Sequence, residues 1–297
     1  MTIVPTLTTL FEIDRHPLRP TTQEIEDHGN HVRERLGFET QSGEAVQGIL
    51  TRPKADGSFP AILYIHAHGN RYDIGARELL DGRPALQGPL GTVLAGSGFV
   101  TLAIDLPGFG GRATASESAL AKARLWRGRS LAGQMLGELA SALDWLAARP
   151  DVDALRIGAF GISMGATLGY WLAAVDPRVA CVAHLCCFAD FDRLIETGAH
   201  DLHGIYLTIP GLIEVASNGR IAGLIAPRPQ LIGLGDLDPL TPPHAVDPAL
   251  AAVRAGYAEA GALENLVVVR QAGVGHRESP EMRAAVPAFF RRHLGPG

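Results

Sequence analysis

The chain has 297 residues, 46% of them hydrophobic, and a formal net charge of -5. This length suits one large domain with a substantial buried core, and the charge gives no reason to expect binding to nucleic acid or to an anionic membrane. No apolar stretch reaches membrane-spanning length, and the N-terminus lacks a signal-peptide pattern. The three cysteines, Cys181, Cys186 and Cys187, are odd in number and two are adjacent, which argues against a disulfide framework. We therefore expect a cytoplasmic protein.

The predicted elements begin with an N-terminal extension, residues 1–32, and a helix near Thr22–Arg35. An antiparallel hairpin follows, with strands at Val32–Thr40 and Glu44–Thr51. Downstream, short apolar runs alternate with longer amphipathic segments, which predicts an α/β fold with a mainly parallel central sheet flanked by helices. The predicted strands are Ala61–His66, Phe99–Asp105, Leu155–Ile162, Val179–Phe188, Gln230–Leu234 and Asn265–Gln271. The predicted helices are Leu131–Arg149, Met164–Val175, His244–Ala260 and Pro280–His293.

The segment 189–225 interrupts this alternation. A loop of this length usually carries short helices of its own or a function, so we expect a small helical insertion, a lid, within one domain at 33–297. Tyr206 and Leu207 in the insertion, with His68 upstream, are candidates for a substrate pocket. His200 and His203 either line this pocket or lie on the surface of the protein.

The motif Gly161-Ile-Ser163-Met164-Gly165 stands between a predicted strand and a predicted helix. In that context G-x-S-x-G indicates a nucleophile elbow, where the glycines permit a tight turn that exposes the serine hydroxyl. Without its context, G-x-S-x-G is weak evidence for a nucleophile. The alternative is a structural turn that contains a serine by chance. We take Ser163 as the candidate nucleophile, and the N–H of Met164 at the helix N-terminus as one donor of an oxyanion hole.

A serine hydroxyl needs a neighbouring base, and the base needs a carboxylate to orient it. His276 follows the last predicted strand and precedes the terminal helix, so it can reach the sheet edge where Ser163 emerges. Asp236 and Asp238 both follow the preceding strand, and either could be the acid. The loop after Ala61–His66 offers a second oxyanion donor, which we assign to the N–H of Asn70.

These residues resemble the α/β-hydrolase superfamily, and within it the dienelactone-hydrolase-like and acetyl-xylan-esterase-like (cephalosporin C deacetylase-like) esterases. The resemblance runs from about Gly37 to His293. Its motifs are His68-Gly69, Gly161-x-Ser163-x-Gly165, Gly235-x-x-Asp238-x-x-x-Pro242 and Gly275-His276. In that family the acid lies three residues after the glycine and four before the proline, which implies Asp238. Dienelactone hydrolases proper carry cysteine at the elbow, whereas this chain carries serine.

The resemblance implies a serine esterase and leaves its acyl and alcohol groups open. We expect it to act through an acyl-enzyme on small or short-acyl esters. Two alternatives remain. One is a peptidase or amidase of the prolyl-oligopeptidase type, although only about 32 residues precede the hairpin and such enzymes usually carry a gating domain. The other is a binding module without catalysis. We expect no cofactor, and no metal, since His66 and His68 lack an evident third ligand. We expect a small-molecule ester as the binding partner. The sequence leaves open whether the protein forms a homo-oligomer.

Overall fold

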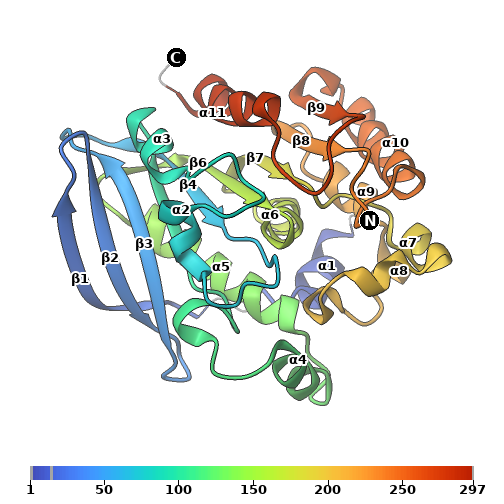
Figure 1. Ribbon diagram of the computed structural model, residues 1–297, viewed down its shortest axis with the longest axis horizontal. Helices are drawn as coiled ribbons and strands as arrows, with labels where there is room; N and C mark the ends of the chain where they lie inside the picture. The colour runs from blue at the N-terminus through green and yellow to red at the C-terminus, as the bar shows by residue number, and fades with distance from the viewer. Residues whose placement is uncertain (1–2, 14–15, 296–297) are drawn as a thin grey trace.

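A computed structural model of the protein describes residues 3–13 and 16–295. Their strands form one nine-stranded sheet in the order β1-β2-β3-β5-β4-β6-β7-β8-β9 (Figure 1). The strands are β1 (Arg19–Asp27), β2 (His31–Glu39), β3 (Ala45–Pro53), β4 (Phe59–Ile65), β5 (Val100–Ile104), β6 (Val152–Ile162), β7 (Val179–Leu185), β8 (Gln230–Gly235) and β9 (Leu266–Gln271). Pairing is antiparallel from β1 through β3 to β5, and parallel from β5 to β9.

Helices cover both faces of the sheet. Their bounds are α1 (Val4–Leu10), α2 (Glu78–Asp81), α3 (Gly91–Gly96), α4 (Glu117–Leu125), α5 (Leu131–Ala147), α6 (Met164–Val175), α7 (Phe191–Thr197), α8 (Leu212–Val215), α9 (Asn218–Gly223), α10 (Pro243–Glu259) and α11 (Pro280–Leu294). The core on one face includes side chains of α3 and α11, and the core on the other includes those of α5, α6 and α10. This layering confirms the predicted fold class.

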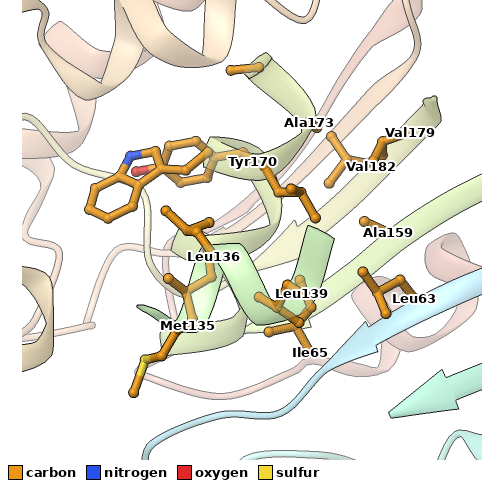
Figure 2. Packing of buried hydrophobic residues seen from close by; sticks show 14 of the residues in the cluster. Leu63, Ile65, Met135, Leu136, Leu139, Ala159, Tyr170, Ala173, Val179 and Val182 are labelled. Carbon is orange, nitrogen blue, oxygen red and sulfur yellow. The ribbon is translucent and has the colours of Figure 1, made fainter. Parts of the chain in front are cut away.

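Strand β4 shows why the parallel strands are apolar nearly throughout. Ile62 and Tyr64 belong to the core beneath α3 and α11, whereas Leu63 and Ile65 belong to the core beneath α5 and α6. Figure 2 shows Ile65 beside Leu139 of α5. A strand whose two faces are both covered by helices has no solvent side, so the alternation of apolar and polar residues disappears.

The predicted helix near 22–35 is wrong, because this region forms β1 and the start of β2. Strand β1 is the sheet edge and is almost wholly exposed, so it has little apolar alternation by which to be recognised. What holds β1 in the sheet is its antiparallel pairing with β2. Glu26 of β1 accepts hydrogen bonds from Arg33 and Arg35 of β2. Opposite charges on neighbouring strands stabilise such a pair modestly.

The segment 189–225 contains α7, two single-turn 3-10 helices (η3, Ala199–Leu202, and η4, Ile205–Leu207), α8 and α9. At the other end of the chain, α1 packs against α6 and α8, and the ring of Phe11 stacks on Trp171 of α6 with centroids 5.2 Å apart. In the described ranges, no helix is both long and apolar enough to cross a bilayer.

Candidate active site

Ser163 lies at the turn between β6 and α6. Its backbone has φ 58° and ψ -119°, a positive φ that non-glycine residues seldom adopt. The turn is held by the neighbouring chain, because the Ser163 N–H donates to the carbonyl of Leu185 at 2.9 Å and its own carbonyl accepts from the N–H of Ala166. The strained backbone keeps the side chain at the start of α6, partly exposed to solvent.

The two elbow glycines are required by close backbone contacts. A Cβ atom at Gly165 would lie 2.0 Å from the carbonyl oxygen of Ile65, and one at Gly161 would lie 2.1 Å from the carbonyl of Gly165. Both distances are far inside van der Waals contact. The same contact shows that α6 begins directly against the end of β4, where the loop 66–70 starts.

His276 lies in the loop between β9 and α11 and reaches Ser163 across 113 positions of sequence. Its Nε2 is 2.9 Å from Ser163 Oγ, and its Nδ1 is 2.7 Å from Oδ2 of Asp238. Because a carboxylate can only accept, Nδ1 carries the proton and Nε2 is left to accept the serine O–H. This is the tautomer that a general base needs.

The two aspartates that the sequence left as alternatives have different surroundings. Asp238 is 1% exposed, and its carboxylate also accepts from the N–H of Leu240 at 2.9 Å and the hydroxyl of Thr241 at 3.0 Å. Asp236 instead pairs with Arg270 on the last strand. The structure therefore brings Ser163, His276 and Asp238 together, and places Asp236 outside this cluster.

The loop after β4 differs from expectation. The N–H of Asn70 donates to Nδ1 of His68 at 3.1 Å, so it is not free to hold an oxyanion, and its assignment as the second donor is corrected. In the described part of the chain, the N–H groups of His68 and Met164 make no hydrogen bond. Met164 begins α6 at the elbow, and His68 lies in the loop after β4, whose end contacts that turn.

The Ala67–His68 peptide is held rigidly by groups beneath it. The carbonyl of Ala67 accepts from Arg83 Nη2 at 2.9 Å and from His66 Nδ1 at 3.0 Å, and the N–H of Ala67 donates to Glu78 at 3.0 Å. Arg83 and Glu78 form a buried ion pair. Two hydrogen bonds to a carbonyl polarise its peptide and strengthen the N–H at the other end as a donor, and that N–H belongs to His68.

The side chain of His68 is part of a buried cluster. Glu117, at the start of α4, accepts from His68 Nε2 at 2.6 Å, from the hydroxyl of Tyr72 at 2.8 Å and from the N–H of Tyr206 at 2.9 Å. The rings of His68 and Tyr206 stack with centroids 5.4 Å apart. One carboxylate thus connects the loop after β4 to the insertion. Glu117 does not stand out in the sequence, because an acidic residue in the first turn of a helix is ordinary.

We expect Glu117→Gln to lower the free energy of unfolding at pH 7 by about 2 kcal/mol, since a buried acceptor of three hydrogen bonds loses its charge. Burial alone would raise the pKa of Glu117, but hydrogen bonds led by the one from His68 lower it below its ordinary value of 4.5. The carboxylate therefore stabilises the fold fully above about pH 4.5, and this contribution is lost as the pH falls through the lower folded-state pKa.

Urea titrations of wild type and variant across pH 3–7 measure this difference. Glu214→Gln, at an exposed position of α8, is the matched control and is expected to change stability little. An equal loss in both variants, or a loss for Glu117→Gln that does not depend on pH, would contradict the role given to the carboxylate.

An open pocket of about 480 Å³ lies in the insertion, and Leu207, His200 and His203 line it. The other two candidates for the substrate pocket, His68 and Tyr206, are buried in the Glu117 cluster and do not line it.

No group of three or more His, Cys, Asp or Glu side chains in the described residues could hold a metal ion. Burial lowers the pKa of His66 to about 3, and its Nε2 accepts from the N–H of Leu106 at 3.2 Å.

Comparison with known proteins places this geometry in a family. The model of the family described as X-Pro dipeptidyl-peptidase (S15 family) matches residues 43–220, more than half of the chain. The chain belongs to this family. Within known sequences, it is 37% identical over 283 residues to "Putative hydrolase YtaP" of Bacillus subtilis strain 168, covering 95% of this chain and 94% of that protein. The expected membership of the α/β-hydrolase superfamily is confirmed.

Solved structures of esterases share the fold. An acetyl xylan esterase from Paenibacillus sp. R4 superposes with a TM-score of 0.69 at 19% identity, over 98% of this chain and 93% of that one. Acetyl Xylan Esterase 1 from Thermoanaerobacterium sp. JW/SL YS485 gives a TM-score of 0.68 at 17% identity, over 96% and 93%. The protein is therefore a hydrolase related by sequence to the S15 family and by fold to acetyl xylan esterases.

Proposed function

We propose that this hydrolase cleaves carboxylic esters with small or short acyl groups through an acyl-enzyme formed on Ser163. The single observation that carries the proposal is the chain of contacts from Ser163 Oγ through His276 to Asp238, at 2.9 and 2.7 Å. A hydroxyl within hydrogen-bonding distance of a base that is itself held by a carboxylate is an activated nucleophile.

In the first half of the reaction, Ser163 Oγ attacks the ester carbonyl carbon while its proton passes to Nε2 of His276. The carbonyl oxygen becomes an oxyanion, which the free N–H groups of Met164 and His68 stabilise. His276 then gives its proton to the leaving alcohol oxygen as the carbon–oxygen bond breaks. Asp238 stays ionised and stabilises the imidazolium throughout.

In the second half, water takes the place of the alcohol. His276 removes a proton from water as the oxygen attacks the acyl-enzyme carbonyl, and it returns that proton to Ser163 Oγ when the bond to the enzyme breaks. The products are a carboxylic acid and an alcohol, and the enzyme regains its starting state. Each step uses groups of this chain and water.

A peptidase is the second candidate, because the family description names a dipeptidyl-peptidase. The same three residues can cleave an amide if the leaving amine is bound and protonated. We expect p-nitrophenyl acetate to be turned over and Gly-Pro-p-nitroanilide to be turned over far more slowly. A fluorophosphonate probe should attach to Ser163, as mapped by mass spectrometry of the labelled peptide.

The outcomes separate the candidates. Faster turnover of the anilide than of the ester would favour the peptidase. An unlabelled protein that turns over neither substrate would exclude both and favour a binding module on a hydrolase fold.

A further inference from the structure

The pocket in the insertion is shaped for an apolar group. Its large apolar wall residues, from α7, η4, α8 and the turns between them, include Phe191, Leu194, Ile205, Leu207, Ile209 and Leu212. Four of these six side chains are buried. Among the polar members, His203 is half-buried, and His200, Asp201 and Thr208 are exposed. Its volume of about 480 Å³ falls within the range typical of small-molecule sites, which are mostly apolar inside.

His203 connects this pocket to the candidate active site. It lines the pocket, and its Nε2 donates to the carbonyl of Leu240 at 2.9 Å. The N–H of the same Leu240 donates to Asp238 at 2.9 Å. One turn of chain therefore joins the pocket wall to the acid that orients His276.

The chemistry decides which part of an ester faces this side. His276 must protonate the leaving oxygen, so the alcohol has to lie next to His276 Nε2. The free N–H groups of Met164 and His68, which would hold the carbonyl oxygen, belong instead to the start of α6 and to the loop after β4. A group that extends past His276 toward His203 therefore belongs to the alcohol.

We propose that the insertion pocket binds the alcohol part of the ester, and that this alcohol carries a bulky apolar group. The proposal rests on the esterase function proposed above. It assigns specificity to the alcohol side of the bond, and it makes a polar sugar alcohol a poor occupant of the pocket.

A matched pair of esters tests the proposal, because cyclohexylmethyl acetate carries the ring on the alcohol and ethyl cyclohexylacetate carries it on the acyl group. Relative to ethyl acetate, we expect kcat/KM to rise about tenfold or more for the first ester and not for the second. Ethanol and cyclohexylmethanol are alcohols of similar acidity, so the leaving-group chemistry is alike. A preference for the ring on the acyl side would overturn the proposal.

Two exposed residues of the pocket allow a variant test that spares the core. Ile195 and Ile213 line the pocket and are 49% and 36% exposed, so Ile195→Asp and Ile213→Asp should fold. Each should lower the ratio of kcat/KM between cyclohexylmethyl acetate and ethyl acetate about tenfold. Ile25→Asp, at an exposed position of edge strand β1, is the matched control and should keep the ratio. An unchanged ratio in both pocket variants would overturn the proposal.

Direct binding separates this proposal from the esterase function. Cyclohexylmethanol should bind to the Ser163→Ala protein, as seen by saturation-transfer NMR, and binding should weaken when Ile195→Asp is added. If no ester is cleaved but cyclohexylmethanol binds and Ile195→Asp weakens its binding, the esterase function fails and the insertion pocket is still a site for an apolar alcohol. If esters are cleaved but the alcohol does not bind, or binds equally to both proteins, the pocket assignment fails alone.

Discussion

Ser163→Ala is expected to lower kcat for a short-acyl p-nitrophenyl ester by roughly a million-fold. The substitution removes the only atom that forms the acyl-enzyme, and His276 is then left with no hydroxyl to activate. The N–H groups of Met164 and His68 would still polarise a bound carbonyl, so a small residual rate above the uncatalysed reaction should persist. Steady-state turnover and loss of fluorophosphonate labelling measure the effect.

The fold of this variant should be unchanged, because alanine has the same backbone freedom as serine at φ 58° and occupies less space. Equal melting temperatures for the two proteins would show this. Ser118→Ala, at an exposed position of α4, is the control and should keep wild-type turnover. If Ser163→Ala retained activity and labelling, another residue would be the nucleophile.

Much of the fold could be predicted from the sequence because the parallel strands are buried on both faces. Runs such as 155–162 and 179–188 are apolar nearly throughout, and the structure has strands at Val152–Ile162 and Val179–Leu185. The elbow could be found for a related reason, since a Cβ at Gly161 or Gly165 would clash with backbone atoms. Because steric contacts require these particular residues, the motif can be recognised from the sequence alone.

Other features depend on long-range contacts that leave little local pattern. Strand β1 is polar and exposed, so the sequence has no alternation of apolar and polar residues that would distinguish it from a helix, and only its pairing with β2 reveals it. The N–H of Asn70 was a reasonable oxyanion donor until the structure showed it bound to His68 Nδ1. Glu117 joins loops 49 and 89 positions away, and no spacing rule connects such residues.

The choice between Asp236 and Asp238 depends both on local sequence pattern and on long-range contacts. Family spacing implied Asp238, whereas the residues alone left Asp236 open, because both follow the same strand. The structure places Asp238 beneath His276 and Asp236 against Arg270. Substitution of each by asparagine is the second decisive experiment.

Asp238→Asn is expected to lower kcat about ten-thousandfold with little change in shape. The carboxylate accepts from Leu240 N–H, from the Thr241 hydroxyl and from His276 Nδ1. An asparagine oxygen that stays on the Leu240 N–H turns its NH₂ group toward His276. Nδ1 must then accept, the ring proton moves to Nε2, and the nitrogen that faces Ser163 can no longer take a proton.

Asp236→Asn is the matched control, because it makes the same chemical change two residues away. Its ion pair with Arg270 is partly exposed, and Arg270 also pairs with Asp247. Such pairs contribute about 1 kcal/mol or less, so turnover should stay within about twofold of wild type. Measurement of kcat for both variants on one ester gives the answer directly. Loss of activity on substitution of Asp236, with activity kept on substitution of Asp238, would require the turn after β8 to rearrange in solution and present the other carboxylate to His276.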